Sequence, residues 1–161
     1  HRDKVTAYVE KGVAEGARVR CGGRWGEGEL EKGFYYLPTV IDQVHTGMSV
    51  VQDEGFGPVV TVETFTTADE AVALANDTIY GLAGAVWTQD AGRSERIASR
   101  LRHGTIWIND FGPYLPQAEW GGFKQSGFGR ELGPTGLAEY LEAKHIYHNT
   151  EPAVTDWFAE D

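Results

Sequence analysis

A glycine-rich segment at residues 120–131 is the part of this sequence best suited to line a ligand pocket. It reads Trp-Gly-Gly-Phe-Lys-Gln-Ser-Gly-Phe-Gly-Arg-Glu and places four glycines and a tryptophan in one short window. Glycine allows the backbone to adopt positive φ, or to pass where a side chain would clash. The preceding residues 104–109, Gly-Thr-Ile-Trp-Ile-Asn, are typical of a buried strand. A strand that leads into such a turn commonly borders a substrate or partner pocket.

Several segments of the chain together resemble the aldehyde dehydrogenase superfamily, and they occur in the family's order. In that family a strand ending in Trp-x-Asn leads to Phe/Trp-Gly-Gly-x-Lys-x-Ser-Gly-x-Gly-Arg-Glu, which the two segments above match. Further matches are Gln-Asp-Glu-Gly-Phe-Gly-Pro at 52–58, Ala-Asn-Asp-Thr-Ile-Tyr-Gly-Leu at 75–82 and Leu-Gly-Pro-Thr-Gly-Leu at 132–137. The resemblance spans about residues 2–149, and the loop 109–120 looks most like the betaine-aldehyde or aminoaldehyde branch.

The resemblance covers only the last third of such enzymes, which are roughly three times as long as this chain. The family's nucleophilic cysteine, general-base glutamate and dinucleotide-binding fold precede the matched segments, so no residue here is predicted to be catalytic. The resemblance implies the C-terminal portion of an NAD(P)-dependent aldehyde dehydrogenase, inactive alone, that in full would oxidise an aldehyde to the acid. The competing hypothesis is a non-catalytic interaction or assembly module from a truncated or split gene.

The resemblance assigns cofactor contacts to Glu54 and Phe56. The glutamate would hydrogen-bond the nicotinamide ribose, since a carboxylate can accept from two adjacent hydroxyls, and the phenylalanine would pack near the nicotinamide ring. The alternative is a surface glutamate beside a core phenylalanine. Gly55 stands where the family has a branched apolar residue, which predicts a looser turn. NAD and NADP both stay open, because the preference is set upstream.

The resemblance also assigns Trp120, Tyr114 and Phe111 to the pocket for the aldehyde. Aromatic faces attract a cationic substrate by roughly 0.5–2 kcal/mol each, and Glu119 nearby would add a negative field. The alternative for Trp120 is packing beneath the glycine turn, while the two hypotheses balance for Tyr114 and Phe111.

Four other side chains receive structural or negative assignments. Asn109, at a strand end, is expected to hold the glycine loop through its side-chain amide. Cys21 lacks the family's nucleophile motif and is predicted to be a buried structural cysteine. His145 and His148 would face opposite sides of a strand, so no metal site is predicted.

Composition limits the class of protein. A chain of 161 residues with 41% hydrophobic and 24% charged residues is typical of one soluble globular domain. The net charge of −10 argues against nucleic acid and anionic membranes as partners. A single cysteine fits a reducing, cytoplasmic setting.

Helical and strand patterns alternate, which predicts an α/β fold with a largely parallel sheet. The resemblance makes this a partial three-layer catalytic domain at 1–134, a helix and oligomerisation strand at 135–150, and a tail at 151–161, with a homo-oligomer as the expected assembly. Thr67 with Glu70, and Asp90, are predicted helix caps. Helices are expected at 2–15, 67–76, 90–101 and 135–143, and strands at 17–21, 35–44, 59–65, 82–88, 105–109 and 144–148.

Overall fold

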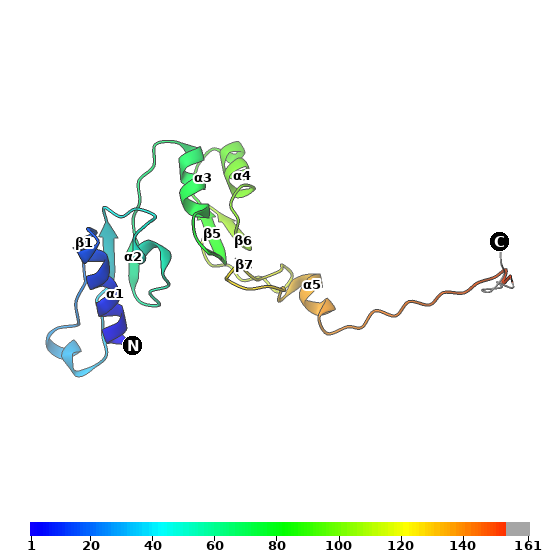
Figure 1. The fold of residues 1–161 in the computed structure, drawn as a ribbon, viewed down its shortest axis with the longest axis horizontal. Coiled ribbons are helices and arrows are strands. Elements are labelled where there is room, and N and C mark those ends of the chain that lie inside the picture. The colour runs from blue at the N-terminus through cyan, green and yellow to red at the C-terminus, as the bar shows by residue number, and fades with distance from the viewer. Residues whose placement is uncertain (154–161) are drawn as a thin grey trace, which may run out of the picture.

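The helices and strands fall into two consecutive groups along the chain (Figure 1). The structure is a computed structural model, and it describes residues 1–153. The first group contains α1 (Arg2–Ala14), β1 (Arg18–Cys21), the 3-10 helix η1 (Gly28–Lys32), β2 (Thr39–Asp42), α2 (Ser49–Gln52) and β3 (Val59–Thr61). The second contains α3 (Ala68–Asn76), β4 (Tyr80–Gly81), β5 (Ala83–Val86), α4 (Ala91–Ala98), β6 (Thr105–Ile108), β7 (Phe123–Lys124) and α5 (Gly133–Ala138).

The main core lies in the first group, where α1 and α2 pack together beside the sheet β1-β2-β3. Its buried members are Val9, Ala17, Ile41, Met48 and Val50. Along α1, Val5, Val9 and Gly12 are buried, whereas Val13 is 49% exposed. A Cβ at Gly12 would overlap the Val50 side chain, so the glycine allows α1 to approach α2 closely.

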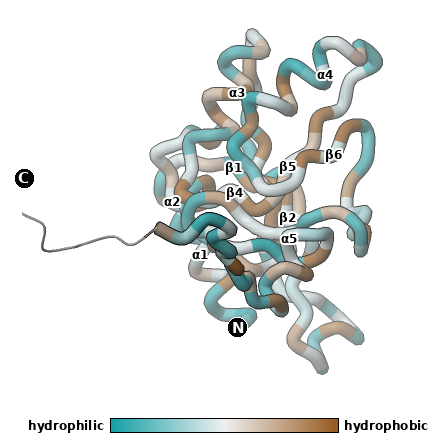
Figure 2. The backbone as a smooth tube through the Cα atoms, turned by 90° about the vertical axis from the view of Figure 1, so that its right-hand side faces the viewer, coloured by the Kyte–Doolittle hydropathy of each residue, from teal (hydrophilic) through white to brown (hydrophobic). Residues whose placement is uncertain are grey.

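The predicted largely parallel sheet is only partly correct. The pairs β2–β3 and β5–β6 are parallel, whereas β1–β2 and β4–β7 are antiparallel. Each parallel pair is joined through a helix, α2 or α4, as a parallel crossover requires. The strands therefore form three small sheets among the described residues, and Figure 2 shows hydrophobic segments along β5 and β6.

Both predicted helix caps are confirmed. At α3 the Thr67 hydroxyl accepts from the Glu70 N–H at 3.2 Å, and the Glu70 carboxylate accepts from the Thr66 N–H at 2.7 Å. At α4 the Asp90 carboxylate accepts from the Arg93 N–H at 2.9 Å. These bonds satisfy N–H groups that the first turn of a helix leaves free.

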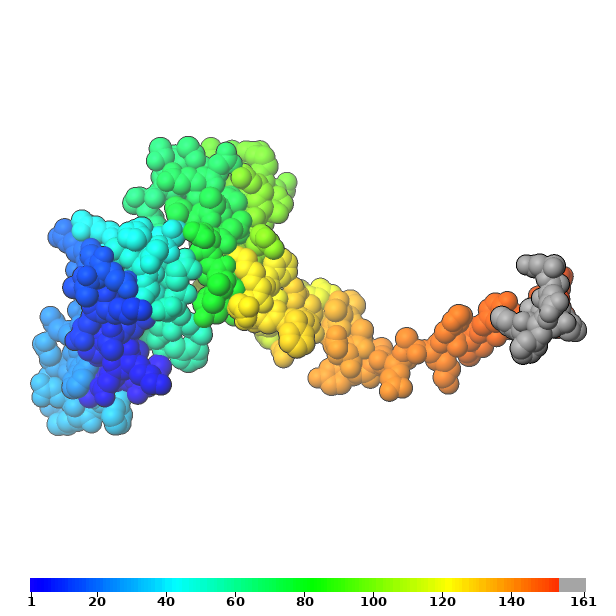
Figure 3. All heavy atoms as spheres, in the orientation of Figure 1, coloured from blue at the N-terminus to red at the C-terminus, as the bar shows by residue number. Residues whose placement is uncertain are grey.

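The C-terminal segment departs from the prediction. Helix α5 ends at Ala138, and residues 141–149 are exposed without a helix or strand, so the strand expected at 144–148 is absent. A strand exists only when paired, and this segment leads away from the rest of the chain (Figures 1 and 3). Most of the predicted tail, residues 154–161, lies outside the described residues. Within residues 1–153, no helix combines the length and apolar character needed to cross a membrane.

Candidate functional site

Four aromatic side chains gather where β6 leads into the loop 110–120. The ring centroid of Trp107 lies 5.3 Å from that of Phe111 and 6.0 Å from that of Trp120. Tyr114 meets Trp120 edge to face, with their centroids 5.1 Å apart. Aromatic pairs prefer such separations and tilted geometries. The structure therefore brings together the three side chains predicted to line the aldehyde pocket.

Backbone and side-chain hydrogen bonds hold this aromatic cluster in place. The Trp107 indole N–H donates to the Pro113 carbonyl at 3.2 Å, which ties the loop to β6. Trp120 and Glu131 exchange two backbone hydrogen bonds of 2.8 and 2.7 Å, and these close the glycine segment into a hairpin-like turn. The Tyr114 hydroxyl donates to the Glu131 carboxylate at 3.4 Å.

A small apolar pocket of about 190 Å³ opens beside the cluster. Trp107, Tyr114 and Trp120 line it, together with Thr105, Pro113, Leu115, Ala118, Glu119 and Leu132. Phe111 does not line the pocket, and its ring is 77% exposed where it packs against Trp107. The sequence assignments of Trp120 and Tyr114 therefore coincide with pocket walls, whereas Phe111 lies behind one of them.

Sequence reasoning missed Trp107 as a pocket residue. The pattern of residues 104–109 predicts a strand that leads into the glycine segment, and side chains two positions apart in a strand share a face. Thr105 and Trp107 have that spacing, and both line the pocket. The alternation of residues along β6 was therefore a signal that could have identified Trp107.

Two titratable groups border the pocket. Partial desolvation among the rings raises the pKa of Tyr114, and the nearby Glu131 carboxylate raises it further. A hydrogen bond from its own backbone N–H lowers the pKa of Glu119, with help from the Thr135 hydroxyl, which donates at 3.2 Å. Near neutral pH the pocket thus presents a neutral phenol and a carboxylate.

Glu54 and Phe56 lie in the loop between α2 and β3, in the first group of elements. Both are exposed, and the Phe56 ring has 77% of its surface open to solvent. The hypothesis of a core phenylalanine is therefore wrong. Phe56 has a positive φ of 46°, and its carbonyl oxygen lies 2.6 Å from His1 Nε2.

At Gly55, where the sequence predicts a looser turn, the Tyr8 ring lies against the backbone. A Cβ there would lie 2.6 Å from Cε1 of Tyr8, so the glycine allows the Tyr8 ring to cover the turn. The Tyr8 hydroxyl bonds the carbonyls of Val50 and Asp53 at 2.7 and 3.2 Å. Through these two hydrogen bonds, Tyr8 on α1 holds the backbone that precedes Glu54.

Asn109 has a structural role, but with a different partner from the predicted one. Its side-chain amide bonds the backbone of Thr88, two residues beyond the end of β5, instead of the glycine loop. The glycine loop is held by other groups: the Lys124 ammonium donates to the carbonyls of Asn76 and Thr78 at 2.9 and 3.0 Å. The Ser126 hydroxyl accepts from the Gly81 N–H at 3.0 Å.

The predicted cofactor residues and the predicted aldehyde-pocket residues are not bonded to one another in the part of the chain that the structure describes. Among the described residues, no hydrogen bond, ion pair or ring contact links Glu54 or Phe56 to the aromatic cluster. The two groups of elements are tied by Gln52, whose amide donates to the carbonyls of Thr46 and Asp77 at 2.9 and 2.8 Å. The chain thus supplies two separate surfaces for ligand contact.

Cys21 is exposed, so the prediction of a buried structural cysteine is wrong. It ends β1, and its thiol lies 4.0 Å from the Pro38 carbonyl. Over residues 1–153, no group of three or more His, Cys, Asp or Glu side chains is arranged to hold a metal ion.

Known proteins similar to this chain are about three times as long. Betaine aldehyde dehydrogenase of Bacillus subtilis (strain 168) is 59% identical over 98% of this chain and 32% of its own length. Peroxisomal aminoaldehyde dehydrogenase 1 of Pisum sativum is 45% identical over 96% of this chain and 31% of its own. A crystal structure of Staphylococcus aureus betaine aldehyde dehydrogenase in complex with NAD+ superposes with a TM-score of 0.93 at 53% identity, covering 99% of this chain and 32% of that one. Residues 1–146 match the aldehyde dehydrogenase family, and the chain belongs to that family.

Proposed function

We propose that this chain is the C-terminal third of an NAD(P)-dependent dehydrogenase that oxidises betaine aldehyde or a related aminoaldehyde to the acid. The observation that supports the substrate class best is the aromatic cluster of Trp107, Tyr114 and Trp120 beside the carboxylate of Glu119. Aromatic faces and a nearby negative charge stabilise a quaternary or primary ammonium group. The relatives named for betaine aldehyde and for aminoaldehydes agree with that chemistry.

The cofactor surface is proposed at Glu54 and Phe56. An exposed carboxylate can accept from the two hydroxyls of a ribose, and an exposed ring can pack against a planar heterocycle, so both side chains fit a nicotinamide nucleotide. When bound, NAD or NADP would accept the hydride from the substrate. Tyr8 would act by fixing the backbone of the turn that presents Glu54.

The division of the chain follows from this proposal. Residues 1–134 would belong to the catalytic domain, residues 135–150 would carry the assembly segment, and residues 151–161 would form a tail. Ile146 and Tyr147 are 80% and 79% exposed, which suits a segment that pairs with another subunit of a cytoplasmic homo-oligomer. The chain contains no cysteine in the family's nucleophile motif, so the chain alone would turn over no aldehyde.

The decisive experiment is a steady-state assay on the product of the gene's complete reading frame. Glu54→Gln should raise the KM for the cofactor and lower kcat, and Trp120→Ala should raise the KM for betaine aldehyde more than that for a neutral aldehyde of similar size. The isolated chain, incubated with NAD, NADP and betaine aldehyde, should form no reduced cofactor above the blank. Unchanged kinetics in both variants would refute the site assignment, and a complete reading frame without aldehyde oxidation would favour an assembly module.

A further inference from the structure

Helix α1 lies against the turn 53–57, which carries both proposed cofactor residues. Its contacts come from Val5, Tyr8 and Lys11, which follow one another at intervals of three residues and therefore share one face of the helix. Val5 is buried and Tyr8 is half-buried, whereas the exposed Lys11 ammonium pairs with the Asp53 carboxylate at 3.5 Å. An exposed ion pair of this kind contributes little to stability, so Val5 and Tyr8 make the contacts that fix the turn.

The turn meets α1 with its two glycines. A Cβ at Gly55 would lie 2.6 Å from Cε1 of Tyr8, and a Cβ at Gly57 would lie 2.7 Å from Cγ2 of Val5. The residues that alternate with these glycines are the two proposed cofactor residues, and both are exposed. The glycines therefore allow the helix to approach the backbone of the turn closely, while the side chains proposed to bind the cofactor remain accessible.

The Tyr8 hydroxyl reaches the end of α2, from which the chain enters this turn. It donates to the Val50 carbonyl at 2.7 Å and, over a longer distance, to the Asp53 carbonyl at 3.2 Å. The last carbonyls of a helix have no partner within that helix, so the hydroxyl supplies a bond that α2 cannot make by itself. Burial raises the pKa of Tyr8, and the Asp53 carboxylate raises it further, so the hydroxyl remains a donor near neutral pH.

We infer that Tyr8 is a positioning residue for the nicotinamide cofactor, and that it holds the end of α2 and the backbone at Gly55 so that the Glu54 carboxylate can meet the ribose. The inference rests on the proposal that Glu54 and Phe56 contact the cofactor. The Tyr8 hydroxyl is engaged by backbone carbonyls, so Tyr8 is assigned no contact with the nucleotide. Its effect on cofactor binding should therefore depend on the presence of the Glu54 carboxylate.

Tyr8→Phe in the product of the gene's complete reading frame removes the hydroxyl and keeps the ring. The dissociation constant of NAD, or of NADP if that nucleotide supports the faster turnover, should rise about three- to tenfold in calorimetric titrations. At saturating nucleotide, the KM for betaine aldehyde should change less than about twofold, since the aromatic cluster lies in and after β6.

Tyr36→Phe is the matched control. Tyr36 is also half-buried and, like Tyr8, packs against the main core, but its hydroxyl has no hydrogen-bond partner among the described residues. Removing that hydroxyl should therefore leave the dissociation constant of the nucleotide within about twofold of the parent value.

A double-mutant cycle with Glu54→Gln separates positioning from a general loss of stability. Where Tyr8 acts through the Glu54 carboxylate, Tyr8→Phe should raise the dissociation constant by less than about a further twofold in the Glu54→Gln background. A purely structural role predicts the same factor in both backgrounds.

Deuterium exchange in the same proteins, without nucleotide, reports on the end of α2. The Gln52 and Asp53 N–H groups donate to the carbonyls of Met48 and Ser49 at 3.2 and 2.8 Å. Exchange at these two amides should be faster in Tyr8→Phe, because the variant releases the end of the helix that the hydroxyl holds.

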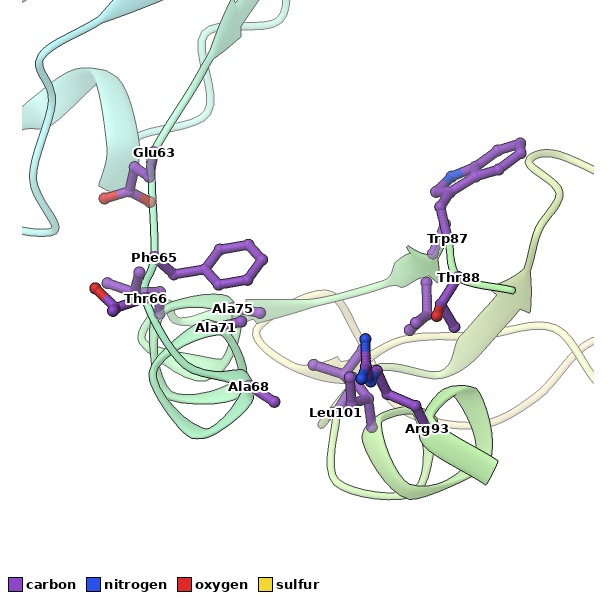
Figure 4. Close-up of a pocket in the computed structure, with 14 residues that line it drawn as sticks. Glu63, Phe65, Thr66, Ala68, Ala71, Ala75, Trp87, Thr88, Arg93 and Leu101 are labelled. Atoms are coloured by element: carbon purple, nitrogen blue, oxygen red, sulfur yellow. The ribbon is translucent and has the colours of Figure 1, made fainter. Parts of the chain in front are cut away.

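The amide of Ala71 is an internal reference for the exchange measurement. It donates to the Thr67 carbonyl at 3.0 Å within α3. Ala71 lines a groove of about 760 Å³ between α3 and α4, to which neither α1 nor the turn 53–57 contributes a residue (Figure 4). Exchange at Ala71 should therefore be the same in the parent and in Tyr8→Phe.

Three results would each overturn the inference: equal rises in Tyr8→Phe and Tyr36→Phe, an undiminished effect of Tyr8→Phe in the Glu54→Gln background, or unchanged exchange at Gln52 and Asp53. A weaker nucleotide complex in Glu54→Gln but not in Tyr8→Phe also overturns it, and leaves the proposed function standing. Glu54→Gln without effect on the dissociation constant refutes the cofactor assignment in the proposed function, and with it this inference.

Discussion

The side-chain amide of Asn109 forms two hydrogen bonds with the backbone of Thr88. Its Nδ2 donates to the Thr88 carbonyl at 2.9 Å, and its Oδ1 accepts from the Thr88 N–H at 2.8 Å. Asn109 reaches this position with a φ of 53°, in the left-handed region that asparagine tolerates better than most residues. The pair joins the ends of β5 and β6 immediately before the loop that carries the aromatic cluster.

Asn109→Ala should destabilise the chain, because it removes both hydrogen bonds and leaves a Cβ in the left-handed region. We expect the free energy of unfolding to fall by about 2–4 kcal/mol in urea titrations. Asn109→Gly is the control, since glycine keeps the backbone conformation and loses only the amide. A loss in the glycine variant as large as that in the alanine variant would show that the left-handed conformation contributes nothing.

Trp107→Phe should loosen the loop 110–119 while leaving an aromatic ring in the cluster. The change removes the indole N–H that bonds the Pro113 carbonyl, a contribution of about 0.5–1.5 kcal/mol. Deuterium exchange in residues 114–119 should become faster, whereas the exposed Trp87→Phe should leave that exchange unchanged. Equal exchange in the parent and Trp107→Phe would contradict the role of this bond.

Two glycines in helices should respond to alanine in opposite directions. At Gly12 the added Cβ would overlap Val50, and overpacking of this kind costs about 1–3 kcal/mol. At Gly92 the nearest atom is the movable Arg96 guanidinium at 3.1 Å, so alanine should stabilise α4 by about 0.5–1 kcal/mol. Thermal unfolding should place the two variants on opposite sides of the parent, and a shared direction would contradict the packing at α1.

Acid should weaken the contact between Glu15 and Ser49. The Glu15 carboxylate accepts from the Ser49 N–H at 2.7 Å and from its hydroxyl at 2.9 Å, and these bonds lower the pKa of Glu15. A carboxyl with a lowered folded pKa stabilises the protein above its unfolded pKa, and that stabilisation is lost as the pH falls through the folded pKa.

Urea unfolding of the parent and Glu15→Gln between pH 7 and pH 3 measures this effect. The parent should be the more stable at pH 7, and the gap should narrow as the pH falls below about 4.3, the usual glutamate value. Ser49→Ala, which removes one of the two donors, should reduce the gap at pH 7 in a double-mutant cycle. A gap that does not change with pH would show that the carboxylate charge is not what stabilises the contact.

The sequence by itself determined the features that depend on neighbours along the chain. Thr67 caps α3 through Glu70, three positions away, and Asp90 caps α4 through Arg93 at the same spacing. Such bonds form inside a single helical turn, so the residue types and their spacing are sufficient to predict them. The family motifs are likewise short runs whose order along the chain is visible without a structure.

Only the tertiary structure decided which distant residues meet. Asn109 bonds Thr88 instead of the glycine loop, Gly12 of α1 packs against Val50, and Trp107 lines a pocket with Trp120 and Tyr114. Residues 144–148 form no strand, although their pattern favours one. Each outcome depends on contacts between segments that are distant along the chain. Packing and strand pairing form between such segments, so the local sequence pattern does not identify the partner.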